Sequence, residues 1–253
     1  MFYIVISKFD TLLAGARKIA DKCSQIYLQN EIISIDTFTG RKFLDSDILY
    51  FLTNDPIVSE NLDIANHTGV YIVNGKYLIS KTVKSDTMAR LDLADIVTPN
   101  RWIISDSDGF SKQISRELDY PVYLKNEQHG KAIKVPDESI MSTTLSSIDL
   151  RDGWYIEKAV DDNNRVHKKV YFVGNELFTD GETDIAFNTD IKKKIISVIQ
   201  TLALDVSSID ILIGASDYYL IDVNHCPALF NSVNAQLAFA ELILRMSGRI
   251  LLK

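Results

Sequence analysis

Three oxygen-bearing side chains near the C-terminus have the types and the spacing to hold a divalent cation. Asp222 and Asn224 lie in the strand-like run Tyr218–Asn224, and side chains two positions apart point to the same face of a strand. Asp210 lies in a second apolar run, Ile209–Ile213. Carboxylate and amide oxygens with few other charges nearby suit Mg²⁺ that carries nucleotide phosphates. The sequence therefore predicts a magnesium site if the two runs lie side by side.

A short turn can bring these two runs together. The segment Gly214-Ala215-Ser216-Asp217 between them is a hairpin signal. Folding about this turn places Asp210 opposite or diagonal to Asp222. The alternative is that Asp222 and Asn224 only open the loop that ends at Pro227, without binding a metal.

Two lysines are candidates for phosphate contacts. Lys125 ends an apolar strand and faces a polar loop that contains Gly130 and Lys131, so its ammonium group can meet phosphate oxygens as a point charge. Lys84 precedes a helix that starts near Asp86. The alternative for both lysines is a solvated surface position, and a loop with one glycine is weak evidence for a phosphate cradle.

Two further strands carry candidates for nucleotide binding and for charge stabilisation. Backbone N–H and C=O groups of one short segment could read an adenine ring while a valine packs on its face. This candidate hinge consists of Glu157, Lys158, Ala159 and Val160. His167 and Lys169 share one face of the next strand, and Lys169 could neutralise a phosphoryl group or a tetrahedral oxyanion. The alternative for the candidate hinge is an ordinary amphipathic strand. The alternative for His167 and Lys169 is a solvated strand face.

The cysteines and the histidine near the acidic pair give a weaker signal. His225 and Cys226 adjoin Asn224, but neither has a second metal ligand or a catalytic base at recognisable spacing. Cys23 and Cys226 are too few for a disulfide framework or a cysteine zinc site. We expect Cys226 to pack before Pro227.

The N-terminal third has the pattern of a small parallel sheet. Apolar runs that are bounded by polar residues alternate with a helical pattern over Thr11–Ile26. The expected strands are Phe2–Ser7, Ile32–Ile35, Ile48–Leu52 and Val70–Val73. This alternation predicts an α/β domain over residues 1–83, and Asn74-Gly75 near its end is a turn signal.

The remainder of the chain mixes helices and strands. The expected helices are Thr87–Ala94, Phe110–Leu118, Ile191–Leu202 and Asn234–Leu251. The expected strands are Trp102–Ile104, Pro121–Lys125 and Ala132–Val135, with Trp154–Val160 and Val166–Val173 forming a hairpin. The apolar face of the last helix is expected to be core, with a homodimer interface as the alternative.

Bulk composition limits the class of protein. The chain of 253 residues is 46% hydrophobic and 24% charged, as in ordinary globular proteins. Its net charge of −7 argues against unspecific nucleic-acid binding. No apolar run approaches the ~20 residues that span a bilayer, and the first residues lack the basic start of a signal peptide. We therefore expect a cytoplasmic protein with neither a membrane nor a nucleic-acid partner.

Taken in order, these pieces resemble an ATP-grasp protein from about residue 70 to the end, and in particular the RimK-type and glutathione synthetase-like carboxylate–amine ligases. The similar segments are Gly69–Asn74 with Lys84 and Thr98-Pro99, Tyr120–Lys125, Tyr155–Val160, and Ile209–Leu212 with Ile221–Pro227. The last match is the most specific, because residue types, spacing and hairpin topology agree.

The resemblance implies an α/β (α+β) fold in which two ATP-grasp subdomains of the α+β type follow a small α/β parallel-sheet domain. The corresponding ranges are 1–83 for the N-terminal domain, 84–160 for the central subdomain and 161–253 for the C-terminal subdomain. It also implies that Mg-ATP, with Mn²⁺ as an alternative metal, binds between the subdomains. A carboxylate substrate is then activated as an acylphosphate and attacked by an amine, and both substrates are small molecules or peptides.

The resemblance also implies residue roles. Lys84, Lys125 and the loop with Gly130 and Lys131 would hold phosphates, while the segment from Glu157 to Val160 would present backbone groups to adenine. His167 stands where the family often has a ribose-binding acid, and Lys169 where it often has an arginine that contacts phosphate or the reacting carboxylate. Asp210, Asp222 and Asn224 would ligate magnesium.

Three departures from the family pattern leave other functions open. The glycine-rich lid is reduced to Gly130, and the segment between Phe178 and Ile191 is shorter than the substrate-binding segment of RimK-type ligases. Asp222 also replaces the usual glutamate, and this shorter side chain leaves open whether one metal ion or two are bound. The alternatives are a nucleotide-binding regulatory or degenerate ATP-grasp module with little catalysis, and an ATP-grasp kinase.

Overall fold

The computed structural model shows two compact units within the chain. It describes residues 1–7, 12–53, 69–80, 83–104, 117–127, 132–161, 164–179, 189–215, 217–229 and 231–251. Unit 1 comprises residues 1–82, 168–210 and 222–253, and unit 2 comprises residues 83–167 and 211–221. The division at residues 83 and 160 that the sequence suggests stays a prediction.

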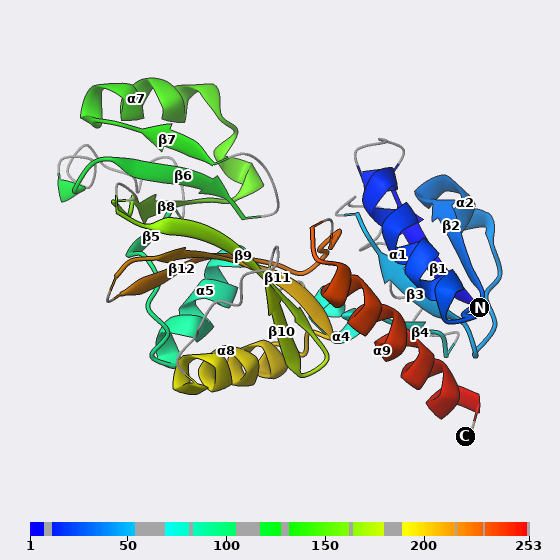
Figure 1. Cartoon of the computed structure of the whole chain (residues 1–253). Helices are drawn as coiled ribbons and strands as arrows, with labels where there is room; N and C mark the ends of the chain where they lie inside the picture. The colour runs from blue at the N-terminus through cyan, green and yellow to red at the C-terminus, as the bar shows by residue number, and fades with distance from the viewer. Residues whose placement is uncertain are drawn as a thin grey trace. The chain divides into compact units, whose positions relative to one another are not determined.

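Unit 1 contains the parallel sheet that the N-terminal sequence predicts. Its order is β2-β1-β3-β4, and every adjacent pair is parallel (Figure 1). The strands are β1 (Phe2–Ile6), β2 (Asn30–Ser34), β3 (Ile48–Phe51) and β4 (Tyr71–Ile72), and the helices are α1 (Leu13–Gln25), α2 (Ile35–Gly40) and α4 (Gly75–Ile79). All residues of β1 and β3 are buried, as expected of parallel strands that are covered on both faces.

A second sheet has the order β10-β9-β11-β12. Its strands are β9 (Val166–Val173), β10 (Glu176–Thr179), β11 (Val206–Ile213) and β12 (Tyr218–Asn224). Helix α8 (Thr189–Thr201) buries an apolar stripe of Ile195, Val198 and Ile199. Helix α9 (Val233–Leu251) contributes Ala235, Phe239, Ala240 and Ile243 to the same core as β1 and α1. Along the chain, β11 and β12 each contain a boundary between the two units.

Unit 2 contains an antiparallel sheet with the order β5-β8-β6-β7. Its strands are β5 (Arg101–Ile104), β6 (Val122–Asn126), β7 (Ile133–Val135) and β8 (Trp154–Lys158), and its helices are α5 (Lys84–Leu93) and α7 (Glu138–Ser147). The expected hairpin of β8 with β9 is wrong. Strand β8 pairs with β5 on one edge and with β6 on the other, so neither edge remains for β9.

Several elements differ from the sequence expectation. Helix α7 was not expected because its sequence is rich in Ser and Thr and buries only Met141, yet Asp137 caps it by accepting a hydrogen bond from the Ile140 N–H at 3.1 Å. The turn expected at Asn74 is present, with a left-handed backbone at φ of 59°, but Gly75, expected to share this turn, is the first residue of α4. Most of the helix expected at Phe110–Leu118 lies outside the described residues.

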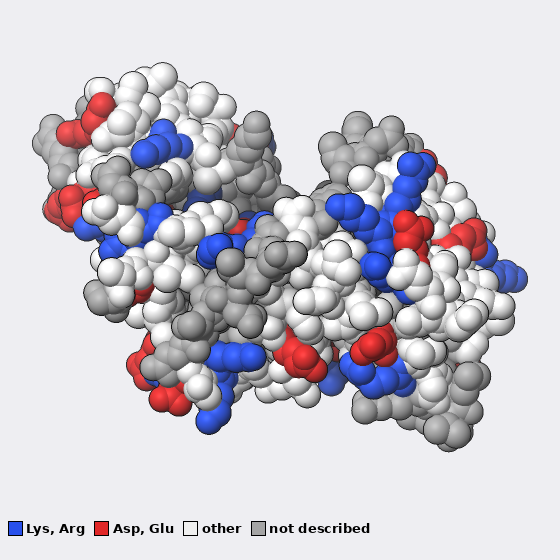
Figure 2. Space-filling view, in the orientation of Figure 1, with Lys and Arg blue, Asp and Glu red and all other residues white. Residues whose placement is uncertain are grey.

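Surface charge and helix hydrophobicity are the two features that relate to nucleic-acid and membrane partners. Among the described residues on the face drawn in Figure 2, acidic and basic side chains are interspersed without a continuous basic field. No helix in the described ranges has the length and apolar character to cross a membrane.

Candidate active site

Strands β11 and β12 form the hairpin that the sequence predicts. They are hydrogen-bonded neighbours, and the short loop between them closes with the Gly214 N–H donating to the Asp217 carbonyl at 2.9 Å. Neighbouring strands that are joined by so short a loop run antiparallel. The Arg165 guanidinium supports the loop by pairing with the Asp217 carboxylate at 2.5 Å and by lying 5.3 Å from the Tyr219 ring centroid.

Asp210 has a cationic neighbour on the adjacent strand. The Lys169 Nζ lies 3.4 Å from the Asp210 Oδ1, and the two side chains are 35% and 15% exposed. Strand β9, which carries Lys169, is the sheet neighbour of β11. The structure therefore brings Lys169 to an expected metal ligand, whereas His167 on the same strand is exposed.

The remaining expected metal ligands lie at the end of β12. Asp222 and Asn224 are both partly buried. The Asn224 Oδ1 accepts a hydrogen bond from the Cys226 N–H at 2.9 Å. Asn224 therefore stabilises the start of the loop that ends at Pro227, as the alternative to metal binding predicts. An amide oxygen has a second lone pair, and this contact does not prevent metal ligation.

The donor set fits a hard cation. Within the described part of the chain, no three His, Cys, Asp or Glu side chains gather into a metal cluster. The expected set has only two carboxylates, Asp210 and Asp222, and an amide oxygen. Mg²⁺ is usually bound by one or two carboxylates together with water and phosphate oxygens, so this set suits it.

Lys125 has a buried partner that the sequence reasoning missed. Its Nζ lies 2.5 Å from the Glu157 Oε1 and donates to the Ile221 carbonyl at 3.0 Å. The side chains of Lys125 and Glu157 are 16% and 3% exposed. The register of β6 and β8 places these residues diagonally, because Lys125 pairs with Tyr155. An ammonium group has three donors, and the two contacts use two of them.

Two backbone N–H groups of the candidate adenine hinge already form hydrogen bonds within the protein. The N–H of Lys158 donates to the Asn100 carbonyl at 2.8 Å, and the N–H of Ala159 donates to the Pro121 carbonyl at 3.1 Å. The Lys158 ammonium pairs with the exposed Asp119 carboxylate. These two N–H groups are therefore already used within the sheet, and the adenine-binding role of the segment stays a prediction. Val160, the next residue, is partly buried.

Lys84 is the first residue of α5 and is partly buried. The following N–H, that of Ser85, donates to the Glu127 Oε2 at 2.9 Å. A carboxylate is favourable at a helix N-terminus, where unpaired N–H groups and the helix dipole attract negative charge. Gly130 and Lys131 lie outside the described residues.

The two thiols are unsuited to nucleophilic chemistry. Cys23 and Cys226 are buried and free. Burial raises the pKa of each to about 12, so both stay protonated at neutral pH. The expectation that Cys226 packs into the protein before Pro227 is confirmed by its burial. The Tyr50 Oη donates to the Pro227 carbonyl at 2.7 Å.

Asn74 connects both strands of the hairpin at their outer ends. Its Nδ2 donates to the carbonyls of Val206 at 2.7 Å and His225 at 2.5 Å. Its Oδ1 accepts from the N–H groups of Asp205 at 2.6 Å and Val206 at 3.0 Å. The residue is 1% exposed. Asn tolerates the left-handed backbone, which the turn signal captured, but its partners lie far along the sequence.

Comparisons with known proteins show what this arrangement resembles. Neither a protein-family model nor a curated protein sequence matches the chain. Among solved structures, it is similar to the D-alanine–D-alanine ligase from Bacillus anthracis complexed with ATP, with a TM-score of 0.76 at 12% identity over 98% of this chain and 97% of that chain.

Two further structures share this architecture. A RimK domain ATP-grasp protein from Sphaerobacter thermophilus gives a TM-score of 0.72 at 14% identity over 95% of this chain and 99% of that chain. The ATP-grasp ligase PsnB, complexed with a minimal precursor, gives 0.69 at 11% identity over 97% and 98%. Such coverage of both chains confirms the predicted architecture: the chain has the ATP-grasp fold.

Proposed function

We propose that the protein is an ATP-dependent carboxylate–amine (peptide-forming) ligase that works through an acylphosphate. The observation that carries this proposal is the β11–β12 hairpin, which bears Asp210, Asp222 and Asn224 with Lys169 against Asp210. The ATP-grasp fold supports it, since structures with this fold include ligases, one of them complexed with ATP.

The hairpin residues would hold Mg²⁺, or Mn²⁺ in its place. The metal, when bound, supplies charge neutralisation for the transferring phosphoryl group. Lys169 adds a positive charge from the neighbouring strand and would stabilise the phosphoryl oxygens or the oxyanion that forms when the amine attacks the acylphosphate. Its pairing with Asp210 keeps the ammonium group on the hairpin side of β9.

Nucleotide contacts are proposed for unit 2. Lys125 and Lys84 would bind phosphate oxygens together with Gly130 and Lys131, and Glu157 would position Lys125 through the buried ion pair. Since the N–H groups of Lys158 and Ala159 donate within the sheet, the Val160 N–H is the group we assign to adenine.

For the substrates and the cellular compartment, we propose only general classes. The N-terminal domain would help to hold the acceptor, and the substrates would be a carboxylate and an amine of small-molecule or peptide size. Solved neighbours include a D-alanine–D-alanine ligase and an ATP-grasp ligase complexed with a precursor peptide. We place the reaction in the cytoplasm, as the sequence suggests.

The test is release of ADP and phosphate with a panel of amino acids and short peptides, comparing the native chain with Asp222→Ala. Loss of a charged metal ligand should remove about 3 kcal/mol of transition-state stabilisation, a fall in turnover of at least about 100-fold. Asp21→Ala, an exposed carboxylate on α1, is the matched control and should keep full turnover. Equal turnover by Asp222→Ala and the native chain would end the assignment.

Product analysis separates the alternatives. A ligase releases free phosphate and a conjugate, whereas a kinase leaves the phosphate on a stable acceptor. Binding of Mg-ATP without turnover across the panel would instead identify a regulatory module.

A further inference from the structure

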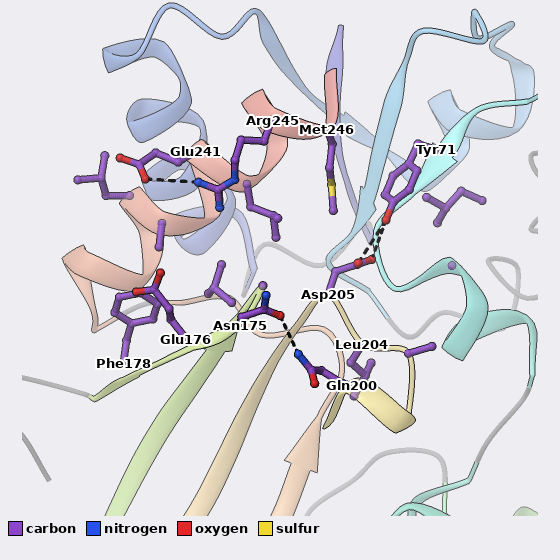
Figure 3. Close-up of a pocket in the computed structure, with 18 of the residues that line it drawn as sticks. Tyr71, Asn175, Glu176, Phe178, Gln200, Leu204, Asp205, Glu241, Arg245 and Met246 are labelled. Atoms are coloured by element: carbon purple, nitrogen blue, oxygen red, sulfur yellow. Dashed lines mark hydrogen bonds and ion pairs between the residues drawn. The ribbon is translucent and has the colours of Figure 1, made fainter. Parts of the chain in front are cut away.

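Unit 1 contains a pocket of about 1,120 Å³ that is formed without any residue expected to bind nucleotide or metal. Its walls come from β4 and α4, the β9–β10 turn, the end of α8 and helix α9 (Figure 3). This volume slightly exceeds the range of about 300–1,000 Å³ that is usual for small-molecule sites.

One side of the pocket carries a partly buried carboxylate. The Asp205 Oδ2 accepts a hydrogen bond from the Asn74 N–H at 2.7 Å, and the Tyr71 Oη lies 3.2 Å from the Oδ1. A carboxylate has about four lone-pair positions, so these donors leave room for another. Burial raises the pKa of Asp205, although the Asn74 N–H, the Tyr71 hydroxyl and the charge of Lys76 oppose the rise. The acceptor positions that remain on this carboxylate suit the N–H donors of a ligand ammonium group.

A guanidinium group lies on another side. Figure 3 shows Arg245 extending from α9 beside Glu241, while Asp205 and Tyr71 lie on the opposite side of the pocket. The Arg245 Nη1 is 3.9 Å from the Glu241 Oε2, beyond hydrogen-bond length, and both side chains are more than half exposed. The planar donors of Arg245 suit a ligand carboxylate.

Apolar and neutral groups lie among these charges. Val173, Leu204, Leu242 and Met246 line the pocket, and the Gln200 Nε2 donates to the Asn175 Oδ1 at 2.8 Å. The lining carboxylates, which are Glu176, Asp205 and Glu241, outnumber the lining cations Lys76 and Arg245, an arrangement that disfavours a polyanion such as a nucleotide.

We propose that this pocket binds a zwitterionic, aliphatic amino acid or dipeptide, with its ammonium group at Asp205, its carboxylate at Arg245 and its side chains on the apolar wall. The site is separate from the candidate active site, and its occupancy requires neither ATP nor metal. Bridging waters can fill the volume that a single amino acid leaves.

The proposal is tested by calorimetric titration of the full chain without nucleotide. The probes are L-leucine, L-leucyl-L-leucine, and two fragments of leucine: isoamylamine, which lacks the carboxylate, and 4-methylpentanoate, which lacks the ammonium group. We expect saturable binding of leucine or of the dipeptide, and each fragment should bind at least about tenfold more weakly.

Two variants locate the ligand. Arg245→Met should weaken binding of the zwitterion by at least about tenfold and leave isoamylamine unchanged, whereas Asp205→Asn should weaken both. Arg151→Met, an exposed arginine of unit 2, is the control and should change neither. Arg245 is on the surface of α9, so its variant keeps the test informative if Asp205→Asn does not fold.

Three outcomes would overturn the proposal. One is the absence of saturable binding by both zwitterions. Another is binding that survives Arg245→Met at full strength. The third is binding that Asp222→Ala abolishes while both pocket variants retain it, because this would place the ligand at the candidate active site.

Discussion

Replacing Glu157 with glutamine would leave Lys125 as a buried cation without its carboxylate. Breaking a buried ion pair from one side costs about 3–5 kcal/mol. The Lys125 side chain is 16% exposed and keeps its contact with the Ile221 carbonyl, which places the expected loss of unfolding free energy near the lower end, about 3 kcal/mol.

The chain provides a local probe for this measurement. Trp102 and Trp154 are its two tryptophans, and both lie within the range 83–167 of unit 2. Tryptophan fluorescence during urea unfolding therefore reports on the unit that carries the pair. A loss below about 1 kcal/mol, the value for exposed ion pairs, would refute the description of this pair as buried.

Two further variants separate stability from nucleotide binding. The double variant Lys125→Met with Glu157→Gln should recover most of the lost stability, because no uncompensated cation remains. If Lys125 contacts phosphate, this double variant should still bind Mg-ATP more weakly than the native chain. Asp119→Asn breaks the exposed pair with Lys158 and should leave the fluorescence transition unchanged.

Three other variants or conditions give distinct outcomes. If the charge of Lys169 acts on the developing oxyanion as proposed, Lys169→Met should lower turnover by about 100-fold with little change in the KM for ATP. A steady-state rate series would show this split. The native thiols of Cys23 and Cys226 should resist iodoacetamide at pH 8, and the stability that their burial confers should be full below about pH 9 and fall as pH rises toward about 12. Asn74→Gly keeps the left-handed backbone but removes four side-chain hydrogen bonds, which should cost at least about 2 kcal/mol and speed hydrogen exchange at the Val206 amide.

Local signals in the sequence predicted a large part of the architecture. The apolar runs of β1 and β3 identify buried parallel strands, because each run is complete within a few residues. The same holds for the β11–β12 hairpin, whose turn residues lie between its two strands. These features need no information from distant parts of the chain.

The features that were missed depend on distant partners. The polar loop after Val160 is compatible with a hairpin, but the partners of β8 are β5 and β6. The ion pair of Lys125 with Glu157 joins residues 32 positions apart. Helix α7 is held by its Asp137 cap and by one buried methionine, so the apolar periodicity that identifies helices is weak there.

The hydrogen bonds of Asn74 have a consequence for protein engineering. A truncated chain that starts after residue 83 would lack this amide and leave the outer ends of β11 and β12 with unsatisfied carbonyl and N–H groups. Chimeras that exchange the N-terminal region for that of another protein with the ATP-grasp fold should therefore retain an asparagine at this bend. The N-terminal region can then be exchanged without disturbing the strand ends beside the proposed cation ligands.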